Sequence, residues 1–125
     1  MFNIRMGIPE MAAFWESLTK KVKAGAATKK ELLRYKIIGK ALYLLSSDPR
    51  HPRLHSHEIS ALTARYGMKV WESYLENNKP AAGRLFWVYG PGKGDITIIG
   101  IEPHPYDKNS AYNKITLSST GDPVK

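Results

Sequence analysis

The chain has 125 residues, a net charge of +8 and no cysteine, and this composition excludes several classes of protein. A hydrophobic content of 42% is enough for one compact core, which predicts a single folded domain. Without cysteine, disulfides, zinc–thiolate sites and thiol nucleophiles are excluded. The sequence has no apolar run long enough to cross a membrane and no secretory signal pattern at its start, so we expect a cytoplasmic protein.

The first half of the chain predicts a strand followed by two helices. "FNIRM" (residues 2–6) alternates apolar and polar residues, as a short strand does. A helix then begins after Pro9 and ends at Gly25, with apolar residues at helical spacing: Met11, Phe14, Trp15, Leu18 and Val22. Thr28 and Glu31 form a capping-box sequence that opens a second helix, which ends before Pro49. We expect this helix to face the core with Leu32, Leu33, Ile37, Leu42 and Leu45.

The second half changes to the alternation of strands, which we place at residues 54–60, 68–76, 83–89 and 95–102. "NNKPAA" and "GPGKG" connect the last three as hairpin loops; "GPGKG" lacks the complete phosphate-loop pattern and precedes a strand. "KITL" (residues 114–117) could add a short strand. The sequence therefore predicts an α+β fold in the order βααββββ, with an antiparallel four- to five-stranded sheet covered on one face by both helices.

Positive charge is concentrated in the first 50 residues, which carry ten Lys/Arg against four Asp/Glu. The segment "TKKVKAGAATKK" (residues 19–30) holds five of these lysines. Such a cluster is typical of a solvated helix face, and equally of a surface that binds RNA phosphates or an acidic partner. Composition alone leaves both interpretations open.

"HPRLHSHEIS" (residues 51–60) contains three of the four histidines of the chain. On a strand, His55 and His57 would point to the same face, as metal ligands do. A metal site lacks an evident third and fourth ligand, so we interpret the pair as exposed or as contacting RNA beside Arg50 and Arg53.

Arg84 is the residue that an apolar strand does not explain. Alternation in "GRLFWVY" (residues 83–89) directs three large side chains toward the helices, namely Leu85, Trp87 and Tyr89. Arg84 then lies on the open face of the sheet, roughly opposite Tyr74. It could form an ion pair with Glu72 or Glu76, or its guanidinium could hold a phosphate and stabilise the transition state.

The next strand leaves the sheet through "EPHPYDKN" (residues 102–109), at one end of the same face. His104 can exchange a proton near neutral pH, and Tyr106 can stack on a base or donate a proton. Pro103 and Pro105 flank His104 and would restrict its backbone. Together with Arg84 and a basic surface, these residues favour cleavage of a phosphodiester bond in RNA.

From about residue 30 to residue 107 the chain resembles the RelE/ParE superfamily, the toxins of bacterial type II toxin–antitoxin systems. The resemblance rests on two stretches, "ALYLLSSDPRHPRLHSHEIS" and "KVWESYLENNKPAAGRLFWVYGPGKGDITIIGIEPHP". The first is a helix that ends in an Asp-Pro turn before a His-containing strand. The second carries an arginine in an Arg-apolar-apolar-aromatic setting and a last strand that exits into a His- and Tyr-bearing segment. The resemblance implies a RelE-like toxin domain over residues 1–107 and a C-terminal extension over residues 108–125.

In the RelE branch the resemblance implies a ribosome-dependent mRNA endoribonuclease that is neutralised by an acidic antitoxin. The RNA 2′-hydroxyl attacks its own phosphate and leaves a 2′,3′-cyclic phosphate, with no metal and no small-molecule ligand. Arg84 matches the arginine that stabilises the phosphate, His104 matches the histidine after the last strand, a candidate general acid, and Tyr106 would stack on a base or assist proton transfer. The general base is open among three candidates: His57, Glu58 and Glu72.

The chain also departs from the family pattern, because Pro105 separates His104 from Tyr106 and the "NNKPAA" loop is longer than usual. The ParE branch shares the scaffold but inhibits DNA gyrase by binding, and a toxin homologue without catalysis is a further alternative. A general RNA-binding domain would use exposed tyrosines, namely Tyr66, Tyr74 and Tyr106. The residues we expect to contact RNA are Arg50, Arg53, His55, Tyr74, Lys69 and Lys108.

Overall fold

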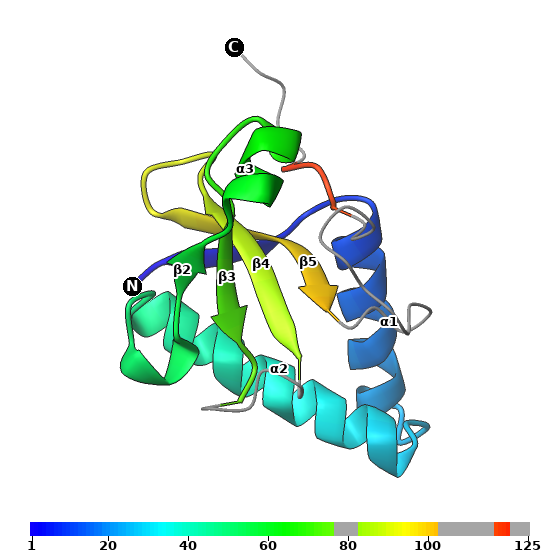
Figure 1. The fold of residues 1–125 in the computed structure, drawn as a ribbon. Coiled ribbons are helices and arrows are strands. Elements are labelled where there is room, and N and C mark those ends of the chain that lie inside the picture. The colour runs from blue at the N-terminus through cyan, green and yellow to red at the C-terminus, as the bar shows by residue number, and fades with distance from the viewer. Residues whose placement is uncertain (77–82, 103–116, 121–125) are drawn as a thin grey trace.

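The computed structural model describes residues 1–76, 83–102 and 117–120, and over these residues the fold is α+β, as predicted (Figure 1). The helices are α1 (Glu10–Lys23), α2 (Lys29–Ser47) and α3 (Ser60–Tyr66), with one 3₁₀ turn, η1 (Pro52–Leu54). The strands are β1 (Asn3–Met6), β2 (His57–Glu58), β3 (Trp71–Tyr74), β4 (Arg84–Tyr89) and β5 (Asp95–Glu102). In these described ranges no helix is both long and apolar enough to cross a membrane.

The five strands form one mixed sheet in the order β1-β5-β4-β3-β2. Strands β2 to β5 pair as the predicted antiparallel meander. The expectation of a purely antiparallel sheet is wrong at β1, which runs parallel to β5 with Asn3 opposite Asp95 and Met6 opposite Ile98. Parallel pairing needs a long crossover connection, and the segment that holds α1 and α2 is the first part of that connection.

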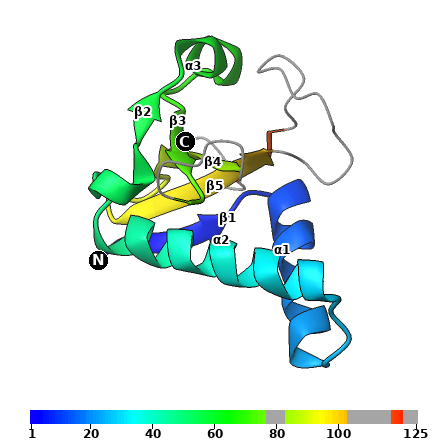
Figure 2. The ribbon, with the colours of Figure 1, turned by 60° about the horizontal axis from the view of Figure 1, so that its bottom comes forward.

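Helices α1 and α2 lie together on one face of the sheet, and the main core is between them and the strands (Figure 2). Leu85 and Trp87 point into this core, as the alternation in β4 predicts. Tyr89 is at the end of the strand and remains 41% exposed. The helices contribute the buried residues Met11, Ile38, Ala41 and Leu45.

The predicted core face of α2 is wrong in its first turns. Leu32 and Leu33 are exposed, and Leu33 retains 59% of its accessible surface. The buried stripe of α2 is formed instead by Ile38, Ala41 and Leu45, with Ile37 and Leu42 partly buried. The physical reason is length, because the N-terminal turns of α2 extend past the sheet toward the loop that leads from α1 (Figure 1).

The strand predicted over residues 54–60 is wrong for most of its length. Pro52 opens the 3₁₀ turn, and His55 takes a left-handed conformation with φ of 50°, so only the two residues of β2 pair with β3. Helix α3 follows at once and ends at Gly67, whose φ is 89°. It covers part of the face that we expected to be open and forms a second, smaller core from Ile59, Leu62, Val70, Phe86, Val88 and Ile99.

Residues 117–120 pack on this second face beside α3. Ser119 forms an isolated antiparallel bridge with Ile8, and Leu117 contacts the smaller core. The Ser118 hydroxyl accepts a hydrogen bond from the Met11 N–H, and the Ser118 carbonyl accepts one from the Tyr66 hydroxyl. Partial burial raises the pKa of that Tyr66 hydroxyl. Residues 108–116 and 121–125, which make up most of the predicted extension, lie outside the described residues, as do residues 114–116 of the possible "KITL" strand.

The start of α2 is fixed by the predicted capping box. The Thr28 hydroxyl accepts a hydrogen bond from the Glu31 N–H at 3.1 Å, and the Glu31 carboxylate accepts one from the Thr28 N–H at 3.0 Å. A hydrogen bond from Lys21 and this bond from Thr28 lower the pKa of Glu31 below its ordinary value. The charged carboxylate therefore stabilises the fold above the pKa of the unfolded state, and this contribution is lost as the pH falls.

We predict that Thr28→Ala lowers the free energy of unfolding by about 1 kcal/mol, because it removes the side-chain partner of one helix-terminal N–H. Urea unfolding at neutral pH, followed by circular dichroism, measures this change. Thr28→Ser, which keeps the hydroxyl, is the matched control and should cost much less. Equal losses in the two variants would contradict a capping role for the hydroxyl.

Candidate active site

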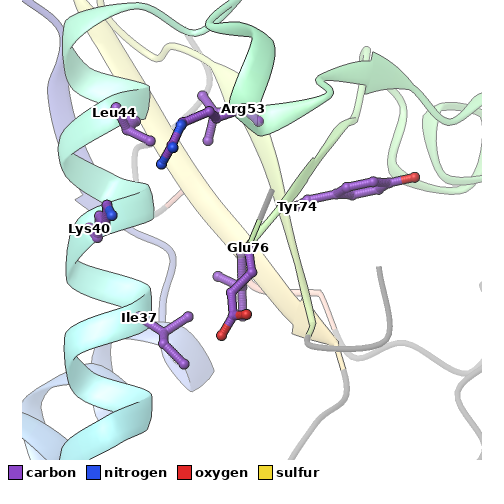
Figure 3. Close-up of a pocket in the computed structure, with 8 residues that line it drawn as sticks. Ile37, Lys40, Leu44, Arg53, Tyr74 and Glu76 are labelled. Carbon is purple, nitrogen blue, oxygen red and sulfur yellow. The ribbon is translucent and has the colours of Figure 1, made fainter. Parts of the chain in front are cut away.

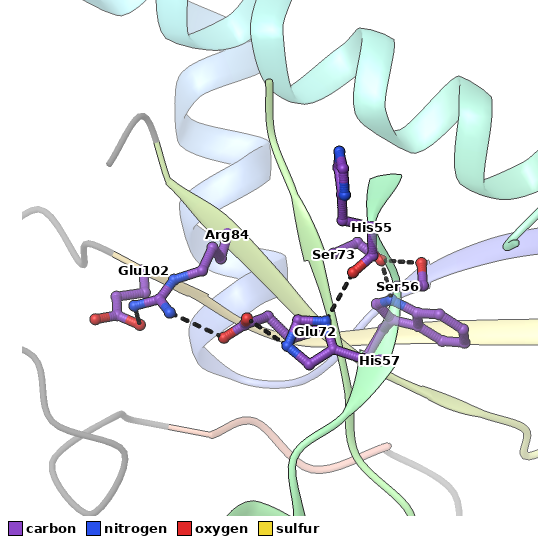
Figure 4. A network of polar contacts seen from close by, with 8 residues as sticks. His55, Ser56, His57, Glu72, Ser73, Arg84 and Glu102 are labelled. Carbon is purple, nitrogen blue, oxygen red and sulfur yellow. Dashed lines mark hydrogen bonds and ion pairs between the residues drawn. The ribbon is translucent and has the colours of Figure 1, made fainter. Parts of the chain in front are cut away.

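Four ionisable side chains form a continuous chain across β2, β3, β4 and β5 (Figure 4). His57 Nε2 lies 3.1 Å from Glu72 Oε1, and Glu72 Oε2 lies 3.2 Å from Arg84 Nη1. Arg84 Nη2 then donates to Glu102 Oε2 at 2.6 Å. Glu72 is only 2% exposed, whereas the His57 side chain is 47% exposed. A buried, fully paired carboxylate thus supports an accessible imidazole.

A β-bulge in β5 brings Glu102 into this chain. Phe86 pairs with Gly100 and Trp87 pairs with Ile98, so Ile99 is an extra residue on β5. Without the bulge, simple alternation from Ile98 would turn Glu102 toward the helices. With it, Glu102 is directly opposite Arg84 and on the same face.

Both ring nitrogens of His57 face hydrogen-bond acceptors. Nδ1 lies 2.7 Å from the carbonyl oxygen of His55, and Nε2 lies against the Glu72 carboxylate. A carbonyl oxygen can only accept, so the proton in the first contact is on Nδ1. The carboxylate oxygen of Glu72 is also an acceptor, so each ring nitrogen of His57 has a partner for a proton that it carries. This is the arrangement of a histidine held in place for proton transfer.

A second polar chain fixes the segment that carries the histidines. The Ser56 hydroxyl lies 2.7 Å from the Pro49 carbonyl and must donate to it. Ser73 therefore donates in its 2.6 Å contact with Ser56, and it accepts from the buried Trp87 indole N–H at 2.8 Å. These hydrogen bonds run from the core through β3 to the loop after α2. They fix the position of the backbone between His55 and His57.

Tyr74 adds an aromatic surface to the site. Its ring stacks on the His55 ring, with centroids 4.9 Å apart, and meets the His57 ring edge-on at 6.4 Å. The left-handed backbone of His55 places its carbonyl toward His57 and its ring toward Tyr74. A non-glycine residue in this conformation carries backbone strain, and such strain is often found at functional sites.

The structure brings together five of the residues that the sequence singles out: Arg84, Glu72, His57, Tyr74 and His55. Of the two interpretations of Arg84, it shows the ion pair with Glu72 and adds Glu102 as a second partner. Glu58, on the opposite side of β2 from His57, accepts a hydrogen bond from Thr63 on α3.

The remaining predicted contacts are spread around the site or lie outside the described residues. Arg53 is exposed and lines a cavity together with Tyr74. Arg50 is exposed on the turn after α2, and Lys69 is exposed in the short segment before β3. His104, Tyr106 and Lys108 lie outside the described residues, so their predicted roles stay predictions.

Sequence reasoning missed Glu102 and the two serines. A lone carboxylate at the end of the apolar run "ITIIGI" was the available signal for Glu102, but the unrecognised bulge reversed its face. Ser56 and Ser73 gave no signal, because single serines are common at strand ends and on the surface.

Comparisons with known proteins do not assign the chain to a family. No family model matches it, and neither the curated proteins nor the solved structures gave a significant match. Over the described residues, no group of three or more His, Asp or Glu side chains is placed to hold a metal ion. Functional inference therefore depends on the geometry and on the motif resemblance.

We predict that Arg84→Met destabilises the fold by roughly 3 kcal/mol, because it leaves Glu72 and Glu102 buried without their cation. Urea unfolding measures the loss. Neutralising the carboxylates in the triple variant Arg84→Met/Glu72→Gln/Glu102→Gln should recover more than half of it. A triple variant as unstable as the single one would show that the charge pairing is not what Arg84 supplies.

Proposed function

We propose that this protein is a ribosome-dependent mRNA endoribonuclease of the RelE type, the toxin of a bacterial toxin–antitoxin pair. The observation that carries the proposal is the accessible His57 imidazole held between the buried Glu72 carboxylate and the His55 carbonyl. The motif resemblance is the reason for proposing the RelE type, and the basic net charge of +8 supports an RNA substrate.

RNA cleavage of this kind needs proton transfer and no redox or cofactor step. The 2′-oxygen forms a bond to the adjacent phosphorus, the bond from phosphorus to the 5′-oxygen breaks, and the products are a 2′,3′-cyclic phosphate and a 5′-hydroxyl. One group must take the 2′-proton and another must protonate the leaving oxygen. His57 is suited to one of these roles, with Glu72 orienting the ring. The stacked Tyr74 and His55 rings offer a surface for a neighbouring base.

Arg84 has two roles in this proposal. It keeps the Glu72 carboxylate paired and in place, and it provides a cation next to the reaction centre. Because Glu72 and Glu102 hold its guanidinium in this structure, direct stabilisation of a phosphate requires Arg84 to exchange a carboxylate for that phosphate. The catalytic contributions proposed for His104 and Tyr106 come from the resemblance alone.

The proposed partners are mRNA on the ribosome and an acidic antitoxin, and the proposed location is the cytoplasm, where translation occurs. The support for both partners is the charge of the chain. Exposed lysines gather on α1 and α2, and two of them pair with carboxylates, Lys20 with Glu16 and Lys21 with Glu31. Such a surface attracts polyanions at low ionic strength.

The test is 5′-end mapping of an mRNA in a translating extract. The wild-type protein should produce new cuts in the ribosomal A site, and His57→Ala should reduce cutting at least about 100-fold, the scale of a general acid–base contribution. His51→Asn is the matched control, because its amide oxygen can replace the ring nitrogen that accepts from the Arg53 N–H. Undiminished cutting by His57→Ala, with the wild-type pattern, would remove His57 from the mechanism.

A second candidate is a protein of the same fold that acts by binding, such as a DNA gyrase inhibitor or a toxin homologue without catalysis. One observation favours it: two carboxylates neutralise Arg84 inside the protein. In this case a folded wild-type protein leaves the mRNA intact in the extract. A gyrase inhibitor also lowers supercoiling by purified gyrase, and an inactive homologue does not.

A further inference from the structure

A cavity of about 300 Å³ lies between α2, the η1 turn and the end of β3 (Figure 3). Its size is at the lower end of the range for small-molecule sites in proteins, which is enough for one small planar group with a polar substituent. The proposed function does not use this cavity, although Tyr74 belongs to both the cavity and the candidate active site.

The inner wall of the cavity is aliphatic. Leu54 and Leu75 belong to the main core and are 1% and 8% exposed, and Ile37 and Leu44 come from the sheet-facing side of α2. A flat ring can be held between such side chains, as bases are in protein pockets that pair stacking with apolar contacts.

The charged residues around the cavity come from three different elements. Lys40 is on α2, Arg53 is on η1 and Glu76 follows β3 (Figure 3). Lys40 and Arg53 are exposed, so their cationic ends can reach an anion at the mouth. A carboxylate at the same mouth accepts hydrogen bonds and repels a second anionic group.

The aliphatic wall, the two cationic side chains and the carboxylate together restrict the class of ligand. A fatty acid or another simple apolar anion would match the wall and the cations, but it carries no hydrogen-bond donor to place beside the Glu76 carboxylate, which can accept several hydrogen bonds. A nucleotide supplies all three requirements: a planar base, N–H groups on the base edge, and a phosphate. We propose that the cavity binds one nucleotide of an RNA strand, with its base on the aliphatic wall, a base N–H directed to Glu76, and its phosphate between Lys40 and Arg53.

This inference rests on the proposed function for its substrate and extends it by a binding subsite. Tyr74 lines the cavity and also contacts the His55 and His57 rings. A strand with one nucleotide in the cavity would therefore pass over Tyr74 toward His57. The cavity then positions the strand, and the His57–Glu72 pair acts on a neighbouring phosphate.

The test is titration of the ¹⁵N-labelled full chain with the four 5′-nucleoside monophosphates, and with ribose 5-phosphate as the base-free probe. We expect concentration-dependent amide shifts centred on Leu44, Leu54 and Leu75. Arg53→Gln should weaken nucleotide binding roughly tenfold, the scale of one charge-assisted hydrogen bond. Arg50→Gln is the matched control, because it removes an exposed arginine from the same loop without touching the cavity.

Glu76→Gln separates the base contact from the phosphate contact. It should change the ranking of the four nucleotides and leave the affinity for ribose 5-phosphate the same or higher. The inference is overturned if no cavity amide shifts at tens of millimolar nucleotide, or if Arg53→Gln and Arg50→Gln bind equally well.

The titration can fail independently of the proposed function. If mRNA is cut in a His57-dependent way and nucleotides do not bind in the cavity, the subsite is wrong and the nuclease stands. If nucleotides bind with the expected dependence on Arg53 and mRNA is not cut, the subsite stands and the nuclease is wrong.

Discussion

The geometry of the site depends on one guanidinium held between two carboxylates. Glu72 and Glu102 are almost fully buried, and two carboxylates on one face of a sheet would repel each other strongly without a cation between them. Arg84 contacts both, with distances of 3.2 Å to Glu72 and 2.6 Å to Glu102. Because the pairing fixes Glu72, it also fixes the carboxylate that faces His57. The exposed His57 imidazole is therefore positioned by the buried ion pairs of Arg84 with Glu72 and Glu102.

The fold contributes two further constraints to the same site. The bulge in β5 turns Glu102 to the face of Arg84, and the serine chain from Trp87 to Pro49 ties the His55–His57 segment to the core. Helix α3 covers the part of this sheet face that carries Phe86, Val88 and Ile99. Within the described residues, the ionisable side chains lie at the end of this face that α3 does not cover. A single face of the sheet is thus divided into a small apolar core and a polar site.

The sequence was sufficient for the elements whose patterns are long and local. The periodicity of α1, the Thr28–Glu31 capping box and the alternation of β4 predicted the right elements and placed Leu85 and Trp87 in the core. Prediction from the sequence failed where a tertiary contact determines the local structure. The two-residue β2 and the short α3 carry too few residues for a periodic signal, and the parallel pairing of β1 depends on partners more than 90 residues away.

The same distinction, between features that local sequence patterns predict and features that depend on tertiary contacts, applies to the candidate site. His57, Glu72 and Arg84 were identifiable as residues that an apolar sheet does not need, and the Arg84–Glu72 pair followed from strand alternation. The side of Glu102 did not follow from alternation, because one extra residue in β5 reverses it. The cavity beside Tyr74 also could not be predicted, since it is formed by three segments that only the fold brings together.

The most direct test of this account is the position of the protons on the histidine rings, measured by long-range ¹H–¹⁵N correlation NMR at neutral pH. His57 should carry a proton on Nδ1, which donates to the His55 carbonyl. His51 should show the opposite pattern, because its Nδ1 accepts a hydrogen bond from the Arg53 N–H. A His57 ring protonated on Nε2 alone, as in free histidine, would contradict the claim that the buried chain and the His55 carbonyl hold this imidazole.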